Sequence, residues 1–206
     1  NTAEPDAVGQ PWNEAVVSNS CGIELWRQRK LWPSQLDPDR AAKYGLTEND
    51  GDGHFHEDIA SGDVIEIVDV DSLGRCVILI CQDIVSEMAR ALIIDIQPDW
   101  VFVPIMDRGF AEKSWFINKT QRLNDVSKAR FVGVCSTALP RDDGQTVYCL
   151  NIICPEDGDE FTPSRVFSFK EAQGSPGAAV HHFGKTEWET FSSVRVNVSA
   201  DRMKKS

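Results

Sequence analysis

Several features that would narrow the function are missing from this chain of 206 residues. It has no apolar run long enough to cross a bilayer and no secretory signal, so we expect no insertion into a membrane. No stretch rich in Gly, Ser or Pro divides it, which favours one domain over two small ones. A dense basic patch is also lacking and the net charge is −11, so we expect neither nucleic acid nor an anionic membrane as a partner.

Metal-binding and disulfide patterns are lacking as well. None of the six cysteines forms a C-x-x-C pair, and most lie in apolar runs, so buried free thiols in a reducing, cytoplasmic compartment fit best. The acidic stretch 48–58 resembles a calcium loop, but Ile59 stands where a bidentate glutamate is needed. We therefore interpret that stretch as a solvated loop and expect no metal and no cofactor.

The pattern of apolar residues predicts an α/β fold with a mixed sheet. The segments 76–81 and 100–104 are apolar on both faces, as in central strands, and the helical pattern between them predicts a crossover that joins parallel strands. Hairpins are expected at the flanks. Other strands are predicted at 14–18, 23–27, 64–68, 131–136, 146–153, 166–169, 179–183 and 193–198, and other helices at 39–44 and 112–129.

Cys81 stands where the predicted central strand turns into the following helix. The free N–H groups at a helix N-terminus favour a thiolate, and the N–H of Gln82 can stabilise the oxyanion that forms when a thiolate attacks a carbonyl carbon. Reactive sites also collect beyond the carboxyl ends of parallel strands. Cys81 is therefore a candidate nucleophile, with a small, inert core residue as the alternative. Cys76, inside the same strand, is expected to be inert. Asp83 or Ser86 can cap the following helix, and Asp83 is interpreted as that cap or as the partner of a cation.

The residues around Cys81 form a wider pattern. Gly74 precedes an apolar run that ends in Ile-Cys-x-Asp, Glu87 and Arg90 follow on a helix, and Asp99 precedes an apolar strand that ends at Pro104. Matching segments occur in order along residues 13–198, namely 25–31, Glu57, Ser61–Gly62, 129–134 and 151–158. This pattern resembles that of the carbon–nitrogen hydrolase, or nitrilase, superfamily.

The resemblance implies a fold and a reaction. The fold would be a nitrilase-like α-β-β-α sandwich with mixed sheets over residues 13–198, between an irregular segment 1–12 and a C-terminal tail 199–206. The reaction would be hydrolysis of a small amide or nitrile through an acyl-enzyme on Cys81. Lys30 would stabilise the negative charge of the intermediate together with the Gln82 N–H, and Glu57 would be a supporting acid. Read without the family, Lys30 is a surface lysine in a basic turn. Family members usually pair, so a homodimer is expected.

One departure from the family concerns the general base. The family's base is a glutamate that ends an early strand, and Glu4, Glu14 and Glu24 do not hold such a position in the pattern. The first strand–helix–strand unit is missing from the sequence, so we expect a segment of a longer protein, either a processed chain or part of a multidomain polypeptide, with an incomplete N-terminal part of the fold. A catalytically inactive scaffold or sensor domain is therefore an alternative to the hydrolase, and acyl transfer to an acceptor other than water is another.

A second departure lies just after the nucleophile. The interval from Cys81 to Glu87 is one residue shorter than usual, and Ser86 stands where a proline is common. This change reshapes the expected pocket wall, so the resemblance does not identify the substrate.

Overall fold

The computed structural model describes residues 9–46, 55–71, 73–107, 115–127, 129–135, 147–153, 165–170, 178–181 and 188–191. Along the chain its elements are β1 (Glu14–Ser18), β2 (Glu24–Arg29), β3 (Gln35–Leu36), α1 (Pro38–Lys43), β4 (Phe55–His56), β5 (Ile67–Val70), β6 (Gly74–Ile78), the 3₁₀ turn η1 (Cys81–Val85), α2 (Glu87–Ile96), β7 (Trp100–Ile105), α3 (Trp115–Ser127), β8 (Arg130–Cys135), β9 (Val147–Ile153), β10 (Arg165–Lys170), β11 (Ala178–His181) and β12 (Trp188–Phe191).

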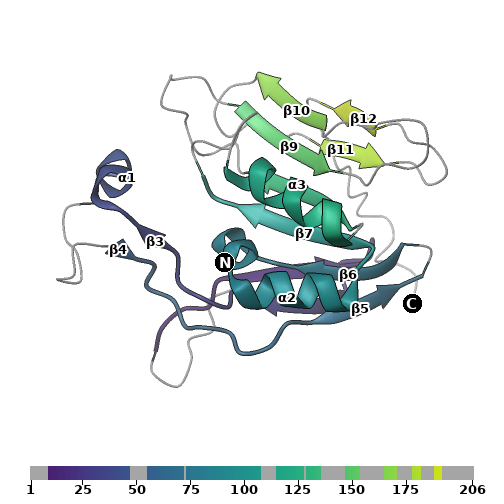
Figure 1. Cartoon of the computed structure of the whole chain (residues 1–206), viewed down its shortest axis with the longest axis horizontal. Coiled ribbons are helices and arrows are strands. Elements are labelled where there is room, and N and C mark those ends of the chain that lie inside the picture. The colour runs from purple at the N-terminus through teal and green to yellow at the C-terminus, as the bar shows by residue number, and fades with distance from the viewer. Residues whose placement is uncertain are drawn as a thin grey trace, which may run out of the picture.

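A six-stranded mixed sheet forms the centre of the fold, in the order β10-β9-β8-β7-β6-β5 (Figure 1). Strands β6, β7 and β8 run parallel, and the pairs at both flanks are antiparallel. The crossovers between the parallel strands pass through α2 and α3, as the strand–helix–strand pattern predicts. The predicted α/β fold with a mixed sheet is therefore confirmed.

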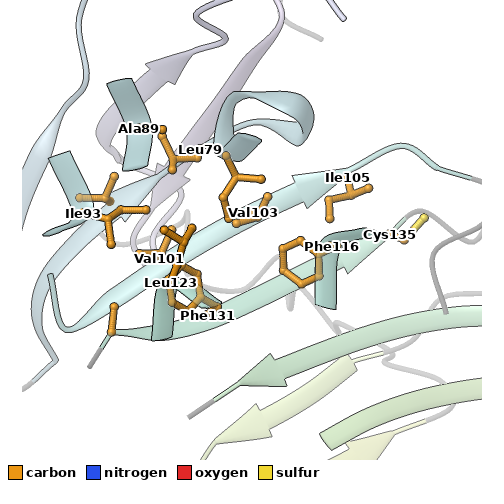
Figure 2. Close-up of a cluster of buried hydrophobic side chains, with 13 residues drawn as sticks. Leu79, Ala89, Ile93, Val101, Val103, Ile105, Phe116, Leu123, Phe131 and Cys135 are labelled. Carbon is orange, nitrogen blue, oxygen red and sulfur yellow. The ribbon is translucent and has the colours of Figure 1, made fainter. Parts of the chain in front are cut away.

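The two helices cover one face of this sheet, where alternate strand residues bury their side chains. Figure 2 shows this cluster between the strands and the helices: Leu79, Ala89, Ile93, Val101, Val103, Ile105, Phe116, Leu123, Phe131 and Cys135. Since side chains alternate across a strand, the residues between them face the opposite side. This apolar layer fixes the register of the parallel strands, and therefore the point at which each strand ends.

The opposite face of the sheet carries a second, smaller cluster of Cys76, Trp100 and Val132. Trp26 of β2 packs against it, so the hairpin of β1 and β2 lies on the side away from the helices. In the turn that joins the hairpin strands, the side-chain oxygen of Asn19 accepts the N–H groups of Cys21 and Ile23. The central strands β6, β7 and β8 are therefore covered on both sides.

The boundaries of two predicted strands are wrong in ways that bear on the site. The strand predicted at 64–68 begins only at Ile67, because the side-chain amide of Gln28 bonds both the Val64 carbonyl, at 2.9 Å, and the Glu66 N–H, at 2.8 Å. The strand predicted at 76–81 ends at Ile78. The strand predicted at 193–198 lies outside the described residues. Among the helices that the structure describes, none has the length and apolar character needed to cross a bilayer.

Candidate functional site

The turn at Cys81 begins just beyond the carboxyl end of β6. Cys81 has a φ of +53°, a left-handed conformation that is uncommon outside glycine and that costs free energy unless surrounding contacts hold it. Its half-buried side chain packs against the cluster of Figure 2. A sharp turn of this kind presents one side chain at the edge of the sheet, where the site was predicted.

The helix after Cys81 begins later than predicted, and Ser86, one of the two expected caps, is its N-cap. Residues Cys81–Val85 form a 3₁₀ turn, and α2 begins only at Glu87, capped by the side chain of Ser86, which accepts the Ala89 N–H at 3.0 Å. Ser86, where the family often has proline, is thus the N-cap of α2. The first N–H groups of a 3₁₀ turn have no acceptor within the turn, and the Gln82 N–H is one of them.

Lys30 follows β2 and is almost completely buried, with 1% of its side chain exposed, so it is not a surface lysine. Its ammonium group donates to the carboxylate of Glu57 and to the hydroxyl of Ser34. A buried ammonium needs such partners, because desolvation of an unpaired charge is costly. The structure therefore brings together Lys30 and Glu57, which lie in separate segments of the sequence.

Glu57 has further donors around it. Asn13 Nδ2 donates to Oε1 at 2.7 Å, and the Ser34 N–H donates to Oε2 at 3.1 Å. Burial acts to raise the pKa of Glu57, but the hydrogen bond and charge of Lys30, with the bonds from Ser34 and Asn13, outweigh it and lower that pKa below its ordinary value. Glu57 is consequently an ionised partner that holds the lysine in place.

Asp83 connects the lysine segment to the cysteine turn. Its carboxylate is buried and accepts the N–H groups of Leu31 at 3.1 Å, Trp32 at 3.2 Å and Ile80 at 3.2 Å. Burial raises the pKa of Asp83 to about 6, although these bonds and the nearby charge of Lys30 act to lower it. Asp83 caps η1, because its carboxylate accepts the N–H of the N-cap residue Ile80. Its bonds to Leu31 and Trp32 were not predicted.

The predicted difficulty with the general base persists among the described residues. The side chain of Glu14 is fully buried and pairs with Arg27 at 2.7 Å and Arg29 at 2.9 Å, while Glu24 pairs with Arg27 at 2.8 Å. Glu4 lies outside the described residues. Within the part of the chain that is described, no carboxylate makes a hydrogen bond to the Cys81 sulfur.

Sequence reasoning missed two members of this site, Asn13 and Ser34. Neither stands in a recognisable motif, and both act through folding contacts between distant segments. Asp83 did carry a signal, since it is the last residue of the Ile-Cys-x-Asp pattern. No group of three or more His, Cys, Asp or Glu side chains in the described residues is placed to hold a metal ion.

Comparison with solved structures identifies the fold. The chain is similar to the glutamine-dependent NAD⁺ synthetase of Acinetobacter baumannii, with a TM-score of 0.56, 18% identity and 82% of this chain covered. It is also similar to Nit3 of Saccharomyces cerevisiae, a member of branch 10 of the nitrilase superfamily, with a TM-score of 0.51, 12% identity and 74% covered. The chain therefore has a nitrilase-like fold, as predicted.

The likeness covers only part of each neighbour. The chain spans 29% of the synthetase chain and 49% of Nit3. No protein-family model matches the sequence, and no curated protein matches it either.

Proposed function

We propose that this domain hydrolyses a carbon–nitrogen bond of a small amide or nitrile, with Cys81 as the nucleophile. The observation that carries the proposal is the buried pair of Lys30 and Glu57, joined through Asp83 to the turn at Cys81. A buried ammonium and a cysteine in a strained turn at the same edge of a parallel sheet is an arrangement suited to nucleophilic chemistry. The nitrilase-like fold supports the reaction class.

In the proposed reaction on an amide, the Cys81 thiolate attacks the carbonyl carbon and forms a tetrahedral intermediate. Lys30 and the Gln82 N–H stabilise the oxyanion, and the C–N bond then breaks as the amine takes up a proton. Water attacks the resulting thioester, releases the carboxylic acid and returns the thiol. Both proton transfers need a general base. A glutamate of the full-length protein is proposed for that role, from the family resemblance.

The absence of a carboxylate bonded to Cys81 in the described residues favours a second candidate, a domain that binds without catalysing within a larger protein. Without a base the thiol is not activated, and water is not activated to hydrolyse an acyl-enzyme. Acyl transfer to an acceptor other than water uses the same site and is distinguished by its product. The homodimer and the cytoplasmic location stay predictions from the resemblance and from the cysteine content.

The test uses the full-length protein and a panel of small amides and nitriles, with release of ammonia or amine as the readout. Loss of turnover in Cys81→Ala and its retention in Cys76→Ala would support hydrolysis, and an acyl adduct on Cys81 in the intact mass would identify the intermediate. Turnover unchanged in Cys81→Ala would overturn the proposal. Neither turnover nor an adduct with any member of the panel would favour the binding domain, while release only on addition of hydroxylamine or an amine would favour acyl transfer.

A further inference from the structure

The Asp83 carboxylate uses both of its oxygens to join two segments of the chain. Oδ2 accepts the N–H groups of Leu31 and Ile80, and Oδ1 accepts the N–H of Trp32. Leu31 and Trp32 directly follow Lys30, whereas Ile80 directly precedes Cys81. One buried side chain therefore fixes the backbone beside the lysine to the backbone beside the cysteine.

The neighbouring residue holds the far end of the same segment. The side-chain amide of Gln82 accepts the Gln35 N–H at 3.1 Å and donates to the Gln35 carbonyl at 3.1 Å, as a strand partner would. Between these two attachments lies Ser34, whose hydroxyl accepts a hydrogen bond from Lys30. Two consecutive residues of the cysteine turn thus hold both ends of the loop that surrounds the lysine.

Capping alone does not explain a carboxylate at this position. Ser86 caps α2, and a hydroxyl would cap a short 3₁₀ turn without the desolvation cost of a buried charge. Asp83 is almost fully buried and its contacts are backbone N–H groups. Two oxygens that accept three N–H groups on two segments are what a carboxylate offers and a hydroxyl does not.

We infer that Asp83 is a positioning residue, which holds the Lys30 segment against the Cys81 turn so that the ammonium lies where charge develops during attack. The inference rests on the proposed function for the roles of Lys30 and Cys81. The inference adds that the distance between Lys30 and Cys81 depends on Asp83. Glu57 holds the ammonium of Lys30, and Asp83 holds the backbone next to it. Asp83 itself touches neither substrate nor sulfur in this account.

The test is a double-mutant cycle on the full-length protein with Lys30→Gln, Asp83→Asn and the combined variant. The readout is the rate at which iodoacetamide alkylates Cys81 at pH 7, measured site by site by peptide mapping, because the thiolate is the reactive form. The exposed Cys21 is the internal control for the reagent, and the buried Cys76 reports unfolding. Asparagine retains the size of aspartate but loses an acceptor oxygen.

The inference predicts that Lys30→Gln slows alkylation of Cys81 about tenfold, and that Asp83→Asn slows it several-fold. Removal of a negative charge near a thiol would by itself speed alkylation, so a decrease in rate reports lost position. In the combined variant, Asp83→Asn should slow the reaction no further than Lys30→Gln alone. Equal slowing in both backgrounds would overturn the inference, because Asp83 would then act independently of the lysine.

The outcomes separate this inference from the proposed function. If Cys81→Ala leaves turnover unchanged, the proposed function fails and the inference fails with it. If Cys81→Ala abolishes turnover but Lys30→Gln leaves alkylation of Cys81 unchanged, the inference alone fails. If Lys30→Gln slows alkylation but Asp83→Asn does not, the inference alone fails. If labelling of Cys76 shows that Asp83→Asn is unfolded, Gln82→Ala replaces it, since this variant releases only the Gln35 end of the loop, and the same non-additivity with Lys30→Gln is expected.

Discussion

Cys76 and Cys81 lie on one short segment yet in opposite surroundings. Cys76 is inside β6, fully buried on the face covered by the hairpin, and its sulfur lies 3.5 Å from the Gly74 carbonyl oxygen. Burial, with the charges of Asp99 and Asp69, raises the pKa of Cys76 to about 11. Cys81 is past the strand end, half-buried, in a left-handed conformation and on the helix-covered face.

The difference between Cys76 and Cys81 shows that the strand determines where a cysteine lies, whereas its surroundings come from other segments of the chain. A cysteine inside the strand is a small core residue, held neutral by its surroundings. Beyond the strand end, long-range contacts bring together the buried cation of Lys30, its carboxylate partner Glu57 and the Asp83 carboxylate, which accepts the N–H groups of Leu31 and Trp32. Substitutions that alter those contacts should therefore change stability or the reactivity of Cys81, whereas a substitution at Cys76 should leave Cys81 unaffected.

The largest effect is expected from Lys30→Met, which leaves the Glu57 carboxylate without its cation. Loss of one partner from a buried ion pair costs about 3–5 kcal/mol of unfolding free energy, measurable by urea denaturation. The double variant Lys30→Met/Glu57→Gln should lose less than the sum of the single variants, because no charge is then left unpaired. Lys119→Met, at the partly exposed surface of α3, is the matched control, expected to change stability by at most about 0.5 kcal/mol. A similar cost for both lysines would contradict the account.

The next effect concerns pH. The pKa of Glu57 is lowered in the folded state, so its contribution to stability is present above its ordinary value of 4.5 and is lost as pH falls through the folded value. The stability difference between wild type and Glu57→Gln should therefore be largest near pH 7 and shrink below about pH 4.5. The pKa of Asp83 is raised, so its effect on stability changes with pH in the opposite direction. Because Asp83 is present in both proteins, its effect cancels in the stability difference. A difference that does not vary with pH would contradict this role.

A smaller effect is expected from Gly62→Ala. The Gly62 N–H donates to the Lys30 carbonyl at 2.8 Å, and an added Cβ would lie 3.0 Å from that oxygen and from the Cβ of Arg29. Overpacking against backbone costs about 1–3 kcal/mol, and the displacement of Lys30 should slow alkylation of Cys81. Ser61→Ala, at the exposed neighbouring position, is the control. Unchanged stability and unchanged labelling in Gly62→Ala would show that this close approach is unimportant.

The smallest effect is expected from Cys76→Ala. Removal of one buried sulfur should cost about 1 kcal/mol, since the truncation is small. The rate of Cys81 alkylation should stay the same, because Cys76 faces the other side of the sheet. A slower Cys81 in this variant would mean that the two sites are coupled, against the contrast drawn above.

Much of the fold could be predicted because burial leaves a direct trace in the sequence. The strands from β6 to β8 are apolar on both faces, and the spacing of the helices between them sets a parallel order. The start of β5 could not be predicted, because the side chain of Gln28 occupies backbone groups at Val64 and Glu66 that a strand would otherwise pair. A side chain that competes with a β-ladder from a distant segment has no local signature.

The site was predicted in part. The position of Cys81 past a strand end followed from the strand pattern. The order of family-like segments placed Lys30 and Glu57 in one site, and the structure joins these two as an ion pair. The 3₁₀ turn did not follow from either pattern, because the Asp83 carboxylate is also bound to Leu31 and Trp32, a contact that depends on tertiary structure. Asn13 and Ser34 are short polar residues of ordinary sequence context, and only the folded chain brings them to Glu57.

The central claim is that the surroundings of Cys81 make it reactive, and alkylation of the wild-type protein at limiting iodoacetamide tests it most directly. Exposure alone would make Cys21 react first, because Cys21 is exposed whereas Cys81 is half-buried. The account predicts that Cys81 is alkylated faster than Cys21 at pH 7, and that Cys76 is alkylated only on unfolding. Faster alkylation of Cys21 than of Cys81 would contradict it.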